Sequence, residues 1–159
     1  MEIESTRYPF CFTGDPKSPS ATRGIIEFFP FNEDLNRFTL TVKNAGADKV
    51  KVTWGASSKE FAAADLAKGV NLAAEFLDNP FSAPFAKVYA TIAAKQGMEV
   101  GLIKQQLHNL PAYLSAAPQE KDSIERIASA LVAKDKAARA NVSAAVTPVK
   151  HVIKVEAVK

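Results

Sequence analysis

Side chains able to perform acyl or redox chemistry are few and scattered in this sequence. The histidines are His108 and His151, and the one cysteine is Cys11. Nucleophilic catalysis needs a serine, cysteine or threonine beside a base, but no Gly-x-Ser-x-Gly turn is present. In Thr13–Pro16, a proline stands where a Gly-Asp-Ser motif would place its serine. We therefore expect the histidines to be structural or solvated, Cys11 to be a small buried apolar residue, and the chain alone not to be catalytic.

Oxygen-rich side chains gather between Asn32 and Asn36, with Glu33 and Asp34 between them. A calcium loop would add a glycine and a distal glutamate, and both are missing. A turn is the better interpretation. We expect neither a metal ion nor a cofactor.

Carbohydrate chemistry has weak candidates. Glycoside hydrolysis would need two facing carboxylates, and nothing in the sequence selects Asp65 and Glu75 over other acids. Trp54, the single tryptophan, would serve as a sugar platform if it were exposed. Because it shares a strand face with Val50 and Val52, a core position is the preferred interpretation.

The elements that position these residues begin with strands. We expect strands at residues 2–4 and 25–29, with residues 8–12 extending the first strand past Pro9. The Gly-, Pro- and Ser-rich residues 13–23 are typical of a loop. Pro30 ends the second strand.

The clearest pattern predicts a β-hairpin. Apolar and polar residues alternate through residues 37–43 and again through 49–54, and the Asn/Gly/Asp-containing residues 44–48 would form the turn. Period-2 alternation predicts that one face of this hairpin is buried and the other wet.

Helices are expected in the middle of the chain. Residues 61–69 predict a short helix closed by Gly69, while residues 70–76 are ambiguous. A long helix should run from 82 to 110, with a bend or a polar contact near Lys95, Gln96 and Glu99, where its apolar stripe weakens. Pro111 should end it.

A last helix should start near Pro118, and residues 149–155 should form a strand that rejoins the sheet. The fold class is therefore α+β: a small antiparallel β-sheet of N-terminal strands and a C-terminal strand, with a long α-helical hairpin. We expect a single accessory domain over 1–159, with strands in 1–61, helices in 62–145 and a returning strand in 146–159.

Charge and hydropathy exclude some classes of function. The net charge is +3, from 20 basic and 17 acidic residues mixed along the chain. The densest basic run (Lys134, Lys136, Arg139) contains no aromatic residue to stack on bases. A solvated helix face explains it, so we expect no nucleic-acid partner. No apolar stretch is long enough to span a membrane.

Several stretches resemble the region after the catalytic domain of SGNH (GDSL-like) hydrolases, particularly long bacterial ones. They cover most of the chain: residues 31–43, 51–55, 61–73, 79–82 and 147–154. Leu-Asn-Arg at 35–37 and Leu-Ala-Lys-Gly-Val-Asn-Leu-Ala at 66–73 are the more specific parts. None of these stretches is a catalytic motif.

The resemblance implies a parent serine ester hydrolase whose Gly-Asp-Ser and Asp-x-x-His blocks would lie upstream of residue 1. This chain would pack on that catalytic domain, in cis or in trans, or shape its substrate entrance, with a carbohydrate ester as one candidate substrate. No catalytic residue is carried over, because Pro148 and not Asp precedes His151 by three positions. Five residues are candidate interaction residues: Asn32, Asn36, Arg37, Trp54 and Asn71.

Two alternatives stay open from the sequence. The chain could be a stand-alone carbohydrate-binding or protein-interaction module that uses the wet sheet face, and a basic nucleic-acid binder ranks last. The N-terminus shows no signal-peptide pattern. The family is often exported, so the compartment is left open.

Overall fold

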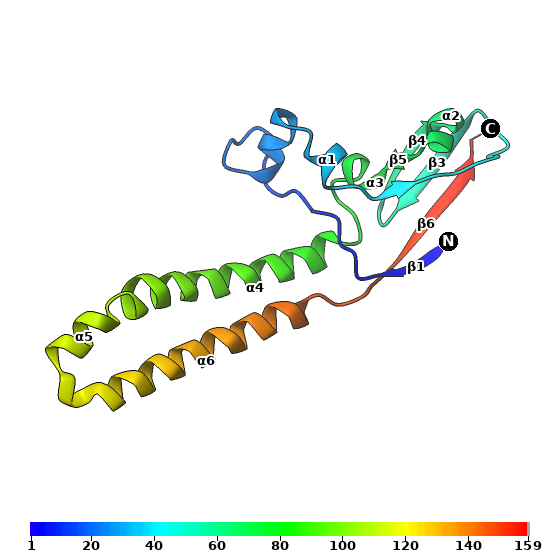
Figure 1. The fold of residues 1–159 in the computed structure, drawn as a ribbon. Helices are drawn as coiled ribbons and strands as arrows, with labels where there is room; N and C mark the ends of the chain where they lie inside the picture. Colours follow the sequence, from blue (N-terminus) through cyan, green and yellow to red (C-terminus); the bar gives the residue numbers. More distant parts are fainter. Residues whose placement is uncertain (159) are drawn as a thin grey trace. The chain divides into compact units, whose positions relative to one another are not determined.

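The computed structural model describes residues 1–158 and has an α+β fold that divides into two compact units. Unit 1 comprises Met1–Ala86 and the segment from Pro148 onward, and unit 2 comprises Lys87–Thr147. The strands of the described chain all belong to unit 1, and the long helical hairpin belongs largely to unit 2 (Figure 1). The predicted fold class is therefore confirmed. Its organisation as a single domain stays a prediction.

The main sheet of unit 1 has four antiparallel strands. Their order is β1 (Glu2–Ser5), β6 (Val149–Ala157), β3 (Lys49–Trp54) and β4 (Ser57–Ala62). The predicted return of residues 149–155 to the sheet is confirmed, and β6 lies between β1 and β3. A second, two-stranded sheet pairs β2 (Thr39–Leu40) with β5 (Val70–Asn71).

The main sheet has a buried face and a wet face, as the alternation predicts. The buried face is formed by alternate residues of β3 and β6: Val50, Val52, Trp54, Val149, His151 and Ile153. On the wet face, the strand register places Lys51 between Glu60 of β4 and Glu156 of β6. Opposite charges directly across a strand pair favour this register.

The predicted hairpin between residues 37–43 and 49–54 is wrong. β3 pairs instead with β4, which follows it after Gly55 and Ala56. Gly55 has φ 66°, a left-handed conformation that glycine adopts without strain. Of residues 37–43, Thr39 and Leu40 form strand β2, whose partner is β5. Alternation had identified the buried face of residues 49–54 but carried no information about which segment lies beside them.

The predicted strand at residues 25–29 is also wrong, because residues Thr22–Phe28 form a 3₁₀ helix, η1. Backbone hydrogen bonds from Arg23 to the Thr13 carbonyl (3.1 Å) and from Gly24 to the Ala21 carbonyl (3.0 Å) hold this segment in turns. A short apolar run does not distinguish strand from helix by periodicity. Residues 8–12 are likewise outside any strand, so only residues 2–5 of the expected first strand form one.

Two short helices contribute to the same core as the sheet, α2 (Ala63–Lys68) and α3 (Leu72–Glu75), while a third, α1 (Phe31–Asp34), contacts Phe10 and Phe12 through Phe31. Leu66 of α2 and Leu72 of α3 are fully buried and join Phe76 and Phe81 in the core. Gly69 ends α2 with φ 109°, so the predicted glycine stop is confirmed.

The helical hairpin contains α4 (Ser82–Gly101), the π-helical segment η2 (Leu102–Leu107), α5 (Leu110–Ala116), the 3₁₀ turn η3 (Pro118–Glu120) and α6 (Lys121–Ala145). The long helix expected at 82–110 is thus interrupted after Gly101, close to the predicted bend. Pro111 does not end a helix but lies in the first turn of α5. Proline suits this position because the first N–H groups of a helix have no intrahelical partner.

Candidate functional site

The candidate residues Asn32 and Asn36 are buried and bonded to the protein itself. Asn36 accepts a hydrogen bond from the Phe10 N–H (2.7 Å) and donates to the Phe10 carbonyl (3.1 Å) and to Asn32 Oδ1 (2.9 Å). Both N–H groups of the Asn36 amide are therefore used. This amide joins the N-terminal segment to α1, and the calcium-loop interpretation of residues 32–36 finds no support.

Asn71 has a similar structural role. Its Nδ2 donates to the backbone carbonyls of Asn32 (2.9 Å) and Asn36 (3.0 Å). Its Oδ1 accepts from the N–H groups of Phe38 (2.9 Å) and Ala73 (3.2 Å), and the latter bond caps α3. Donors and acceptors of this side chain are fully used, so Asn71 has none left for a ligand.

Trp54 is in the core, as the preferred interpretation predicts, with 0% of its surface exposed. Its ring stacks on Phe38 at 5.1 Å between centroids. Its Nε1–H donates to Nδ1 of His151 at 3.1 Å. Trp54 therefore cannot act as a sugar platform in this structure. Arg37 differs from the other four candidates, because it is exposed.

His151 is buried in an aromatic environment formed by Trp54, Phe38 and Phe81, with the Phe81 ring 5.0 Å away. Because Nδ1 accepts from Trp54, the proton of the neutral ring must be on Nε2, and this atom has no hydrogen-bond partner among the described residues. Burial lowers the pKa of His151. The geometry therefore favours a neutral core histidine, not the base of a catalytic triad.

The remaining candidate nucleophile and base are separate from this site. Cys11 is buried, its thiol lies 3.6 Å from the Pro9 carbonyl oxygen, and burial raises its pKa, which disfavours the reactive thiolate. Its predicted role as a small buried apolar residue is confirmed. His108 is exposed and follows the C-terminal end of η2.

The carboxylates considered for glycoside chemistry form ion pairs instead. Asp65 lies 3.7 Å from Lys68, and Glu75 lies 3.0 Å from Lys59. Among residues 1–158, no group of three or more His, Cys, Asp or Glu side chains could hold a metal ion. No helix in the described part of the chain is long and apolar enough to cross a bilayer.

The wet face of the main sheet offers charged and small side chains. Besides the Glu60, Lys51 and Glu156 row, Thr53 and Ser58 share a hydrogen bond of 2.8 Å across β3 and β4. Over strands β1, β3, β4 and β6, none of the wet-face residues is aromatic. The face therefore lacks the ring platform with which proteins commonly stack on sugars.

Unit 2 contains a charged layer where the polar contact was expected. Lys95 of α4 pairs with Glu99 and lies 3.9 Å from Asp135 of α6. Arg139 closes the network at 2.7 Å from both Glu99 and Asp135. The side chains of Lys95 and Asp135 are 15% and 14% exposed, so this layer lies within the seam between the helices. The sequence signal was the weakened apolar stripe at residues 95–99.

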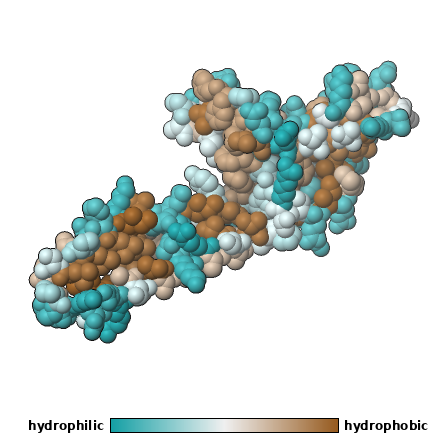
Figure 2. Space-filling view, viewed as in Figure 1, coloured by the Kyte–Doolittle hydropathy of each residue, from teal (hydrophilic) through white to brown (hydrophobic). Residues whose placement is uncertain are grey.

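A docked catalytic domain predicts an exposed apolar patch on this chain, but the sequence did not indicate that unit 2 would carry exposed apolar residues. Leu102 is the one side chain there that counts as buried apolar core within the described residues. Seven large apolar residues are exposed: Tyr89, Val100, Ile103, Tyr113, Ile127, Val132 and Val146. Figure 2 shows hydrophobic surface on this helical part of the chain. Helical spacing does not reveal their exposure, because it places Ile103 and Ile127 with the apolar residues expected to face the other helix.

These observations define the chain as an α+β protein with an antiparallel sheet unit and a helical-hairpin unit. No family model and no curated protein matches it. A similar solved structure is that of a gut microbial diltiazem-metabolizing enzyme, with a TM-score of 0.55 and 17% sequence identity. The similarity covers 99% of this chain and 43% of that chain. At this identity the likeness shows the fold, and this chain spans less than half of that enzyme's length.

Proposed function

We propose that this chain is a non-catalytic C-terminal portion of an SGNH (GDSL-like) ester hydrolase that packs on the catalytic domain or shapes its substrate entrance. The family assignment rests on the sequence resemblance of residues 31–43, 61–73 and 147–154. The accessory role rests on the side chains themselves. Among the described residues, neither Cys11 nor His151 meets the partner that nucleophilic catalysis requires.

The exposed apolar surface of unit 2 is the observation that carries the proposal. Contiguous apolar surface on a soluble protein commonly marks a contact with another protein surface. Two helices alone bury little: the α4–α6 hairpin has one buried apolar residue, Leu102, in 87–147. A catalytic domain packed on Ile103, Ile127 and Val132 would bury their apolar surface. Each Å² of apolar surface buried is favourable by about 25 cal/mol.

The structural comparison also supports an accessory role for this chain. The similar enzyme contains a chain more than twice as long, and the match occupies 43% of it. A fold of this kind therefore occurs as one part of a longer enzyme. We infer by analogy that this chain acts beside a separate catalytic segment, in cis or in trans.

Two experiments test the proposal. The coding sequence upstream of Met1 should contain in-frame Gly-Asp-Ser and Asp-x-x-His blocks, or such a domain should be encoded separately and bind this chain. Hydrolysis of p-nitrophenyl acetate by the chain alone should not exceed the buffer rate. Turnover that disappears on substituting Cys11 or His151 would contradict the accessory role, and His108→Gln serves as the exposed-histidine control.

A carbohydrate-binding module is the alternative. Its structural support is weak, because Trp54 is buried and the wet face of strands β1, β3, β4 and β6 carries no aromatic ring. Calorimetry against a panel of polysaccharides distinguishes the two functions. Tight binding of a glycan without any catalytic domain would favour the module.

A further inference from the structure

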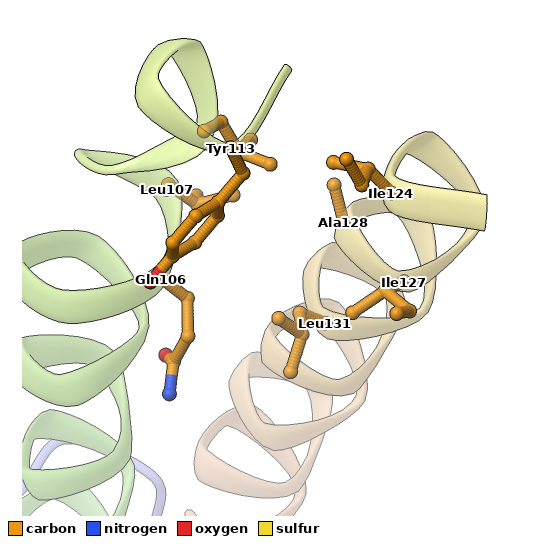
Figure 3. A pocket seen from close by; sticks show the side chains of 8 residues that line it. Gln106, Leu107, Tyr113, Ile124, Ile127, Ala128 and Leu131 are labelled. Atoms are coloured by element: carbon orange, nitrogen blue, oxygen red, sulfur yellow. The ribbon is translucent and has the colours of Figure 1, made fainter. Parts of the chain in front are cut away.

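Unit 2 contains a half-open apolar pocket near the turn of the hairpin. It has a volume of about 150 Å³ and lies between two walls. Gln106 and Leu107 of η2 and Leu110 and Tyr113 of α5 form one wall, and residues of α6 form the other. Figure 3 shows Tyr113 and Gln106 on one side of the pocket and Ile124, Ala128 and Leu131 across from them.

The pocket exists because the chain leaves regular helical geometry here. In η2 the hydrogen bonds follow the wider π pattern, as in the bond from the His108 N–H to the Ile103 carbonyl (3.0 Å). The side-chain amide of Asn109 then donates to the Gln105 carbonyl at 2.6 Å, just before α5 begins. A π turn shifts later side chains around the helix axis and is frequent at functional sites. Here it leaves the space opposite Ala128, whose methyl group is too small to fill it.

The walls determine what can enter. No charged side chain lines this pocket, and its surface is nearly all carbon. A charged group would lose its hydration there without gaining a partner. A volume of about 150 Å³ accommodates a molecule of the size of benzene. The ring of Tyr113 additionally favours an aromatic occupant, through edge or offset contacts.

We propose that this pocket binds a single uncharged aromatic ring of a small molecule, between Tyr113 and the α6 residues Ile124, Ala128 and Leu131. The Gln106 amide, the polar side chain of the lining, would orient a polar substituent on the ring. This site does not depend on the proposed ester-hydrolase role, because binding can be measured on the chain alone.

The test is an NMR titration of the full chain, with ¹³C-labelled isoleucine and leucine methyl groups, against benzene and, separately, benzoate. Saturable shifts should appear at Ile124, Ile127 and Leu131 with benzene, and benzoate should cause none of them. Ala128→Leu fills the pocket and should weaken the benzene response at least tenfold. Ala130→Leu, an exposed neighbour on α6 outside the pocket, is the matched control and should leave the response unchanged.

Three outcomes would overturn the proposal: no saturable benzene shifts, an equal response from exposed methyl groups throughout the chain, or an Ala128→Leu variant that binds as wild type does. Circular dichroism checks that each variant is folded. If Ala128→Leu does not fold, Ala128→Val fills part of the same space with a smaller side chain. The benzene response must then weaken in Ala128→Val as well.

Discussion

Asparagine side chains at the junction of the N-terminal segment, α1 and β5 replace backbone pairing that the sheet does not provide. Asn36 bonds both the N–H and the carbonyl of Phe10, at 2.7 and 3.1 Å. A buried polar group left unpaired costs the full penalty of its desolvation. These amides are therefore structural residues, although their sequence pattern is compatible with ligand binding.

Asn36→Ala should lower the free energy of unfolding by about 1–3 kcal/mol, because the Phe10 backbone groups and Asn32 Oδ1 lose their partner. Arg37→Ala is the neighbouring control: Arg37 is exposed, and surface substitutions usually stay within about 0.5 kcal/mol. Urea unfolding followed by Trp54 fluorescence measures both variants. Equal effects would mean that the amide contacts contribute no more than an exposed side chain does.

The buried His151 should make unit 1 sensitive to acid. Burial lowers its pKa in the folded state below the value of about 6.5 that it has when unfolded. Its neutral form thus contributes fully above pH 6.5, and stability is lost as the pH falls below that value, since the unfolded chain then binds a proton that the folded chain does not.

We expect the urea midpoint of the wild type to decrease between pH 7.5 and pH 5, and this decrease to shrink in His151→Gln. The amide oxygen of glutamine can still accept the Trp54 N–H bond, and it has no proton to gain in this range. His108→Gln is the control variant at an exposed histidine. A His151→Gln variant with an unchanged pH profile would assign the acid sensitivity to other groups.

At the scale of elements, α4 and α6 pack along a seam with a charged layer in it. The less exposed residues of α6 recur at alternating spacings of four and three, as in a coiled coil: Ile124, Ala128, Leu131, Asp135, Ala138 and Val142. Asp135 therefore occupies a seam position and meets Lys95 and Arg139 there. Polar residues at such positions typically fix which turns of two helices lie opposite each other.

Asp135→Asn should destabilise the hairpin by about 1–2 kcal/mol, because Lys95 then keeps only Glu99 of its two acidic partners. The loss is smaller than for a fully buried ion pair, because the Arg139 side chain is 61% exposed. Glu125→Gln makes the same chemical change in an exposed pair of α6, whose Lys121 is 3.8 Å away, and should change stability by less than about 0.5 kcal/mol. Thermal unfolding at low salt and at 1 M salt measures both, and the Asp135 effect should decrease at high salt.

Gly97→Ala should stabilise α4 by about 0.5–1 kcal/mol. Gly97 is helical, an added methyl group meets no atom within 4 Å, and alanine loses less backbone entropy than glycine on folding. Ala94→Gly, at an exposed position of the same helix, should have the opposite effect of similar size. Circular dichroism melts compare the two, and destabilisation by Gly97→Ala would mean that the helix requires flexibility at this point.

Some elements could be predicted from the sequence and others could not, and β3 shows the physical reason. Val50, Val52 and Trp54 alternate because one face of β3 is buried, and that local fact is readable. The partner of β3 was missed, because Ser57–Ala62 is a polar edge strand without alternation of its own. The π segment at Leu102–Leu107 could not be read from side-chain types, because it depends on how the seam packs past the two glycines that precede it.

At the scale of the whole molecule, large apolar side chains are exposed in both units. Phe28, Leu35 and Val152 are exposed in unit 1, and Val100, Ile103, Ile127 and Val132 are among those exposed in unit 2. The sequence resemblance predicted a protein partner. Amphipathic patterning could not reveal this surface, because positions outside the apolar stripe of a helix are expected to face solvent.

Replacing Val100 and Val132 together by serine should weaken binding to a separately supplied SGNH-type catalytic domain by about tenfold or more, an effect of about 1.4 kcal/mol. Val152→Ser is the control from unit 1, with 55% of its surface exposed. Calorimetry measures the affinities. If Val152→Ser weakened binding and the double variant did not, the sheet and not the hairpin would be the contact surface.

The position of β6 between β1 and β3 has a consequence for synthesis on the ribosome. Glu2 pairs with Val152 and Trp54 with Ile153, so the centre of the sheet stays empty while residues 1–86 and the whole hairpin are being made. Contacts so distant in sequence form late and slowly. Until then, β3 has only β4 beside it and its other edge is unpaired, and the nascent chain should depend on chaperones during that interval.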